Sequence, residues 1–86
     1  MRLPVIKHLV GFIHTMDEDY LHETVATLEN LIEAPGLKDA ELDAIGELLS
    51  NMAGALEVHR LINEGKTERE ALNEFMKRVM GSIDKQ

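Results

Sequence analysis

The feature that most constrains this chain is a stretch of apolar residues at helical spacing between positions 38 and 63. Its members follow one another at intervals of three and four, which is the repeat of one helical face. They are Leu42, Ile45, Leu49, Met52 and Leu56. At about 1.5 Å per residue, an unbroken helix over this stretch is about 40 Å long. We therefore expect one central helix whose apolar face contacts more than one neighbour.

Both ends of this helix are marked in the sequence. Glu41 falls at the third helical position, where its side chain can reach back to a free backbone N–H group. Gly65 is well placed as the left-handed residue that ends a helix. Each interior glycine, Gly46 and Gly54, costs about 1 kcal/mol relative to alanine. The stretch is nevertheless predicted to form one continuous helix.

Three further helices are predicted, and together the four cover most of the chain. They run over about residues 4–14, 16–33, 38–63 and 68–80. Apolar residues recur in each at helical spacing, whereas the Asn-Gly or Asp-Gly turns of hairpins are not found. The predicted fold is therefore an all-α, small four-helix bundle with a long third helix. One domain over residues 1–86 is expected, with Gly81 ending the last helix and residues 82–86 as a frayed tail.

Signals for helix starts and stops lie between these helices. Thr15 and Glu18 match the T-x-x-E capping box, in which two side chains satisfy free backbone N–H groups. The same pattern recurs at Thr67 and Glu70. The Ala-Pro-Gly turn at residues 34–36 ends the second helix, and its shortness predicts that the second and third helices are antiparallel.

Charge is distributed unevenly along the chain, whose net charge is −7. Residues 1–16 contain Arg2 and Lys7 and no acid, whereas residues 17–47 contain ten acids and one base, Lys38. Such an acidic middle repels the phosphates of nucleic acids and of anionic membranes. Neither nucleic acid nor a membrane is therefore an expected partner.

Composition excludes some further classes. The chain has no cysteine, so disulfides and thiol chemistry are not available. Its apolar runs are far shorter than the ~20 residues that span a bilayer. The apolar start of the chain is interrupted by lysine and histidine and has no small-residue cleavage site, so no signal peptide is expected. We expect a cytoplasmic protein without a cofactor.

Small residues at a spacing of four suggest a contact between helices. Gly46, Ser50 and Gly54 would leave a shallow groove on the central helix, although they could equally be tolerated surface residues. Methionine side chains adapt to irregular surfaces. The sequence therefore predicts a homodimer interface, formed by Gly46, Ser50, Gly54, Met52, Met76 and Met80.

A second interpretation is a carboxylate–histidine metal site. His14, Glu18 and His22 are each four residues apart, and such side chains one turn apart can share a divalent metal ion. Di-metal bundles, however, use inward-facing Glu-x-x-His motifs on two helices, and this chain does not supply them. A solvated helix face is the simpler interpretation, so divalent-metal binding is kept as the alternative.

Glu29 and Glu33 are like charges at the end of the second helix, where anions are disfavoured. Solvent exposure explains them simply. The other hypothesis is a contact with a basic partner, either within the chain, at Arg2 or Lys7, or on another protein. Salt-sensitive binding would support an external partner.

No arrangement typical of catalysis is present. The serines lack a histidine and an acid at recognisable spacing, and we expect His59 and His8 to be packed, hydrogen-bonded residues. A helix-turn-helix with residues 68–80 as its recognition helix is a third hypothesis, but its exposed face would carry too little positive charge. We therefore expect a non-enzymatic protein.

Three segments resemble a family of short bacterial proteins known only as a domain of unknown function. They are MRLPVIKHLVGFI at the start, ELDAIGELLSNMAGALEV in the middle and ALNEFMKRVMGSID at the end. The resemblance covers nearly the whole chain and implies a cytosolic bacterial protein, but no activity and no site residue. The predicted interface and the absence of catalytic motifs, and not the resemblance, suggest the function. We expect a self-associating helical bundle that acts through protein–protein contacts, with an unidentified protein as a further partner.

Overall fold

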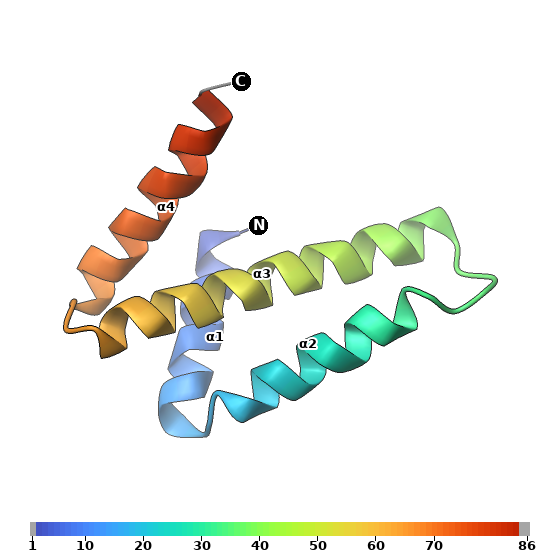
Figure 1. Ribbon diagram of the computed structural model, residues 1–86, viewed down its shortest axis with the longest axis horizontal. Coiled ribbons are helices and arrows are strands. Elements are labelled where there is room, and N and C mark those ends of the chain that lie inside the picture. The colour runs from blue at the N-terminus through green and yellow to red at the C-terminus, as the bar shows by residue number, and fades with distance from the viewer. Residues whose placement is uncertain (1, 85–86) are drawn as a thin grey trace. The chain divides into compact units, whose positions relative to one another are not determined.

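The computed structural model describes residues 2–84, with side chains as far as Val79. This part of the chain consists of four α-helices and has no strand, which confirms the predicted all-α class (Figure 1). The helices are α1 (Leu3–Thr15), α2 (Asp19–Leu31), α3 (Asp39–Asn63) and α4 (Glu68–Asp84). As predicted, the third helix is the longest, with 25 residues. None of these helices combines the length and the apolar character that crossing a membrane requires.

Contacts divide the chain within α3 into two compact units, Met1–Leu56 and Glu57–Gln86. We call them the first and the second unit. The single domain expected over residues 1–86 stays a prediction. The frayed tail expected over residues 82–86 also stays a prediction, and its residues 85 and 86 lie outside the described part of the chain.

The central helix α3 begins and ends as its sequence predicts. At its start, the backbone N–H of Lys38 donates to Glu41 Oε1 over 2.8 Å. At its end, Gly65 adopts a φ of 109°. The N–H groups of Gly65 and Lys66 donate to the carbonyls of Ile62 and Leu61, over 3.0 and 3.3 Å, which is the Schellman pattern. Between these ends α3 is unbroken, since its glycines cost stability without removing a backbone hydrogen bond.

The junction between α1 and α2 differs from the prediction. Thr15 is the last residue of α1, and its Oγ1 donates to the carbonyls of Gly11 and Phe12 rather than capping α2. Instead, Asp17 Oδ1 accepts the backbone N–H of Asp19, the first residue of α2. The predicted capping box at Thr15 is therefore wrong, because its hydroxyl bonds within the helix that precedes it.

The capping box that opens α4 is confirmed. Thr67 Oγ1 accepts the backbone N–H of Glu70 over 3.1 Å, and Glu70 Oε1 accepts the backbone N–H of Thr67 over 2.9 Å. The backbone N–H of Thr67, followed by its hydroxyl, lowers the pKa of the Glu70 carboxyl. The backbone of α4 continues past Gly81 to Asp84, so Gly81 does not end the helix. A helical glycine weakens a helix but does not interrupt its hydrogen bonds.

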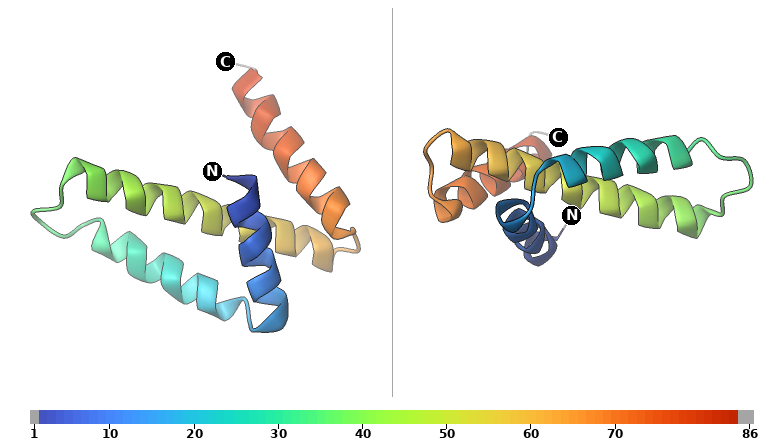
Figure 2. Two further views of the ribbon diagram at one scale, coloured as in Figure 1. Left: turned by 180° about the vertical axis from the view of Figure 1, so that it is seen from behind. Right: turned by 90° about the horizontal axis from the view of Figure 1, so that it is seen from below.

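Within the first unit, α2 and the beginning of α3 form a hairpin of antiparallel helices (Figure 1). The turn between them contains Gly36, whose φ of 87° explains why a glycine is needed there. Helix α1 crosses this hairpin at one end and does not run along it (Figure 2). The most deeply buried apolar residues of the unit are Ile6, Val10, Ile13, Leu21, Ile45 and Ala55.

The start of α1 is tied to α3 by a buried polar side chain. Asn51 is only 3% exposed, and its Oδ1 accepts the backbone N–H of Arg2 over 2.7 Å. Its Nδ2 donates to the carbonyl of Glu47 over 2.9 Å. Because Arg2 is the N-cap residue of α1, Asn51 satisfies one of the free N–H groups at that helix end from a different helix.

Candidate protein-contact site

Large apolar side chains are exposed on the first unit. Among the residues whose side chains are described, all of the large exposed hydrophobic ones lie in this unit. They are Leu3, Phe12, Met16, Tyr20, Leu31, Ile32 and Leu48. Met16, Tyr20 and Leu48 are 56%, 50% and 46% exposed, although each falls at helical spacing. Single exposed apolar residues are common, but a cluster of them indicates a contact surface.

Two adjoining hollows are lined in part by two of these residues, Phe12 and Tyr20. The first has a volume of about 290 Å³ and is lined by His8, Leu9, Phe12, Tyr20, Leu21, Thr24 and Met52. The second, of about 230 Å³, is lined by Tyr20, Glu23, Thr24, Thr27 and Leu28. Because Tyr20 and Thr24 belong to both, the hollows adjoin each other along α2, and we call the two together the recess.

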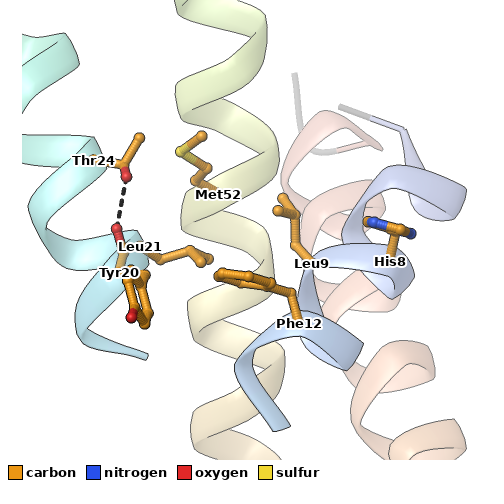
Figure 3. A pocket seen from close by; sticks show the side chains of 7 residues that line it. All are labelled: His8, Leu9, Phe12, Tyr20, Leu21, Thr24 and Met52. Carbon is orange, nitrogen blue, oxygen red and sulfur yellow. Dashed lines mark hydrogen bonds between the residues drawn. The ribbon is translucent and has the colours of Figure 1, made fainter. Parts of the chain in front are cut away.

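Side chains from all three helices of the first unit meet at the recess (Figure 3). Phe12 of α1 points toward Leu21 of α2, while Met52 of α3 points toward Thr24 (Figure 3). The rings of Phe12 and Tyr20 are 5.7 Å apart and pack edge to face at 65°. The Thr24 hydroxyl donates to the carbonyl of Tyr20 over 2.6 Å. The walls of the first hollow are therefore largely apolar, whereas Glu23, Thr24 and Thr27 add polar groups to the second.

Beyond the recess, the apolar face of the hairpin continues toward the turn that joins α2 and α3. Leu48 lies four residues before Met52, so the two share one face of α3. Helix α1 crosses only the other end of the hairpin (Figure 2). Leu48 and Leu31 are 46% and 42% exposed. The apolar face is thus filled at one end and uncovered at the other.

The two units differ in their electrostatics. The first unit contains three bases and ten acids, so it accounts for the whole net charge of −7, whereas the second contains six of each. In the described part of the first unit, neither Lys nor Arg forms an ion pair with an acid. One of its acids, Glu23, lines the recess. The recess is therefore a depression on the unit that carries the net negative charge.

In the second unit, acids and bases pair with each other. Glu57 accepts hydrogen bonds from Arg60 and from Arg78, the latter over 2.6 Å, and Arg60 also pairs with Glu64. Lys66 Nζ lies 3.4 Å from a carboxylate oxygen of Glu74 in α4. Hydrogen bonds from Arg60 and then from Arg78 lower the pKa of the Glu57 carboxyl to about 2, from an ordinary value of 4.5.

We expect Glu57→Gln to lower the free energy of unfolding by about 1 kcal/mol at pH 7. The full shift in pKa corresponds to about 3 kcal/mol, but the two arginines are half exposed and solvent screens the pairs. Since the folded pKa is depressed, this stabilisation is complete above about pH 4.5 and is lost as the pH falls toward 2. Urea denaturation of wild type and variant at pH 7 and pH 2.5 measures both differences. Glu29→Gln is the control, and a difference that does not shrink at pH 2.5 contradicts the prediction.

The residues of the predicted interface that lie in the first unit do not share one face of α3. Two residues along a helix correspond to about 200°, so Ser50 and Gly54 lie nearly opposite Met52 on α3. A Cβ added at Gly46 meets open space, whereas Gly54 is buried and Met52 lines the recess. Met76, in the second unit, is half-buried, and the side chain of Met80 lies outside the described residues. Among those of the six whose side chains are described, Met52 is the one that lines the recess.

The three metal-ligand candidates are placed at the junction between α1 and α2. His22 Nε2 lies 3.7 Å from a carboxylate oxygen of Glu18, and His14 is exposed near the end of α1. In residues 2–84, no group of three His, Cys, Asp or Glu side chains lies close enough to hold one metal ion. Metal binding stays an untested alternative that this geometry does not favour.

Glu29 and Glu33 are exposed, and within residues 2–84 neither forms an ion pair with a base. Glu29 is five residues from Thr24, about 140° around α2, so it lies away from the recess. The acid that lines the recess, Glu23, was not singled out from the sequence.

The two histidines expected to be packed differ from each other. His59 is half-buried, and its Nε2 lies 3.2 Å from Asn63 Nδ2, as expected. His8 is exposed at the recess, so its predicted packing is wrong: α1 buries the opposite face, with Ile6 and Val10.

Sequence reasoning missed Phe12, Thr24 and Asn51. Aromatic residues are rare in this chain, and Phe12 lies outside the apolar stripe of its helix. That position is the signal from which a surface role could have been predicted. A threonine on a helix surface gives no comparable signal.

Comparison with known proteins adds a family but no activity. A family model described as a family of unknown function, DUF6952, matches residues 1–84. The expected resemblance to a family of unknown function is thereby confirmed. No curated protein and no solved structure matches the chain.

Proposed function

Because the chain belongs to DUF6952, a family of unknown function, we propose its role from its geometry: it acts through contacts with other protein chains, a second copy of itself among them, and not as an enzyme. The observation that carries this proposal is the recess of the first unit, which the exposed aromatic side chains of Phe12 and Tyr20 line. Such a surface gains free energy when another protein covers it, at roughly 25 cal/mol for each Å² of apolar area removed from water.

The form of the recess supports a contact with protein side chains. It is shallow and elongated along α2, and it combines aromatic walls with the flexible side chain of Met52. Interfaces are enriched in aromatic residues and methionine at their centres, with polar residues at the rim. Tyr20 and Phe12 are the expected centre of the contact, and Glu23 belongs to its rim.

Photo-crosslinking in cells tests this proposal. A benzophenone amino acid replaces Tyr20 in the recess or, as the matched control, Lys77 on the exposed face of α4. We expect protein adducts of defined mass from position 20 and few from position 77. Adducts with the same chain and with other chains both support the proposal. Equal labelling at both positions, or none at position 20, would overturn it.

Cytoplasmic location and bacterial origin stay predictions from the sequence. Divalent-metal binding and DNA binding remain as alternative functions, and no particular observation favours either one.

A further inference from the structure

We propose that the occupant of the recess is helix α1 of a second copy of this chain, in a symmetric dimer in which each α1 covers the uncovered part of the partner's recess. This inference rests on the proposed function and specifies the partner and the contacting elements. It is carried by the charges and the apolar surface of α1, which complement those around the recess.

Charge determines which part of a second copy can approach the recess. Outside α1 and its cap residue Arg2, the first unit carries ten acids and a single base, so its other helices would bring acid against acid. Helix α1 and its cap residue contain Arg2 and Lys7 and no acid. Lys7 is exposed and forms no ion pair within the described residues of its own unit. Within this unit, α1 is therefore the helix that can lie beside Glu23 without like-charge contact.

The shape and polarity of α1 fit the same role. Its face away from the core carries Phe12, which is 37% exposed, and Gly11, where an added Cβ meets open space. A helix with a bare glycine on its outer face can approach another backbone closely. Phe12 already lines the recess in its own chain. A second α1 placed alongside would cover Phe12 and Tyr20 of both copies at once.

Symmetry follows from the position of the recess. Because α1 forms one wall of the recess, an α1 that enters from a second copy lies next to the α1 already there. A two-fold axis between the two α1 helices then places each in the partner's recess, which is an isologous contact. The dimer thus contains the pairing of Lys7 with the partner's Glu23 twice.

Oligomeric mass of the purified full chain is the first test. We expect a dimer by sedimentation at about 100 μM. Thr24→Arg, which places a long charged side chain in both hollows, should shift the protein to monomer. Ala26→Arg, two residues along on the opposite side of α2, is the matched control and should leave the dimer intact. A monomeric wild type, or a dimer that Thr24→Arg leaves unchanged, would overturn the inference.

Charge reversal is the second test and does not depend on blocking the recess. Lys7→Glu and Glu23→Lys should each raise the dissociation constant about tenfold, since each replaces two attractions by two repulsions. Mixed together, the two variants should form a heterodimer of about wild-type affinity, because both contacts are then between opposite charges. Glu29→Lys is the control for net charge. A mixture that associates no better than either variant alone would overturn the pairing of α1 with the recess.

These outcomes separate the inference from the proposed function. If the purified chain is monomeric but position 20 crosslinks to other proteins in cells, the recess is a contact site whose occupant is a different protein. If position 20 does not crosslink either, the proposed function fails as well.

Discussion

Replacing Asn51 by leucine is expected to lower the free energy of unfolding by about 2 kcal/mol. Asn51 is almost completely buried and makes a 2.7 Å hydrogen bond with the backbone N–H of Arg2. Leucine has the same branched side-chain shape but offers no acceptor, so the backbone N–H of Arg2 at the start of α1 loses its partner. A buried donor without a partner costs about 1–3 kcal/mol. For a chain of 86 residues this is a large part of the total stability.

Chemical denaturation measures the change, with Asn73→Leu as the control. Asn73 is exposed on α4, so the same substitution there should have little effect on stability. Hydrogen exchange gives a local readout, since amide protons at the start of α1 should exchange faster in Asn51→Leu while those of α4 do not. Equal effects of the two substitutions on stability would show that Asn51 does not anchor α1.

The second large effect is expected from two glycine replacements, which should change the free energy of unfolding in opposite directions. Gly65→Ala should lower the free energy of unfolding by about 1–2 kcal/mol, because Gly65 adopts a φ of 109° that a side chain disfavours. Gly46→Ala should raise it by about 0.5–1 kcal/mol, because Gly46 is inside α3 and its Cβ would meet open space. Thermal unfolding of both variants measures the difference, and a shared sign would contradict this account of α3.

Gly46→Ala also separates two proposed interfaces. The sequence placed the homodimer contact on Gly46, Ser50 and Gly54, where an added methyl group would fill the groove and weaken association. The recess lies on another side of α3, at Met52, so a dimer formed there should be unaffected by the methyl group. Sedimentation of Gly46→Ala therefore distinguishes the two surfaces.

Much of the fold follows from local patterns. Intervals of three and four between apolar residues were enough to locate all four helices, since this spacing is a property of the helix itself. The ends of α3, at Glu41 and Gly65, and the box of Thr67 with Glu70 were also predicted, because capping involves residues only a few positions apart. The short range of these patterns also explains the wrong prediction at Thr15. Two local hydrogen-bonding patterns compete there, and the hydroxyl donates to carbonyls of α1 and does not cap α2.

The candidate site was far less predictable. Apolar residues of α2 such as Leu21 and Tyr20 belong to one stripe in the sequence, yet Leu21 is 3% and Tyr20 is 50% exposed. Whether a residue at the edge of a stripe is covered depends on where the neighbouring helix lies, and periodicity does not contain that information. The predicted interface stays a prediction, but it shows the same difficulty, since Met52 and Gly54 are two residues apart in the sequence and lie on different sides of α3.

The sequence alone thus determined the helical class, the length and continuity of α3, its caps, and the segregation of bases in α1 from acids in α2 and α3. These properties depend on composition and on residues close together in the chain. Only the tertiary structure decided that α1 crosses one end of the hairpin, that Asn51 caps a helix other than its own, and that Phe12 and Thr24 line one recess. Those features require contacts between residues as many as 49 positions apart, which packing between helices determines.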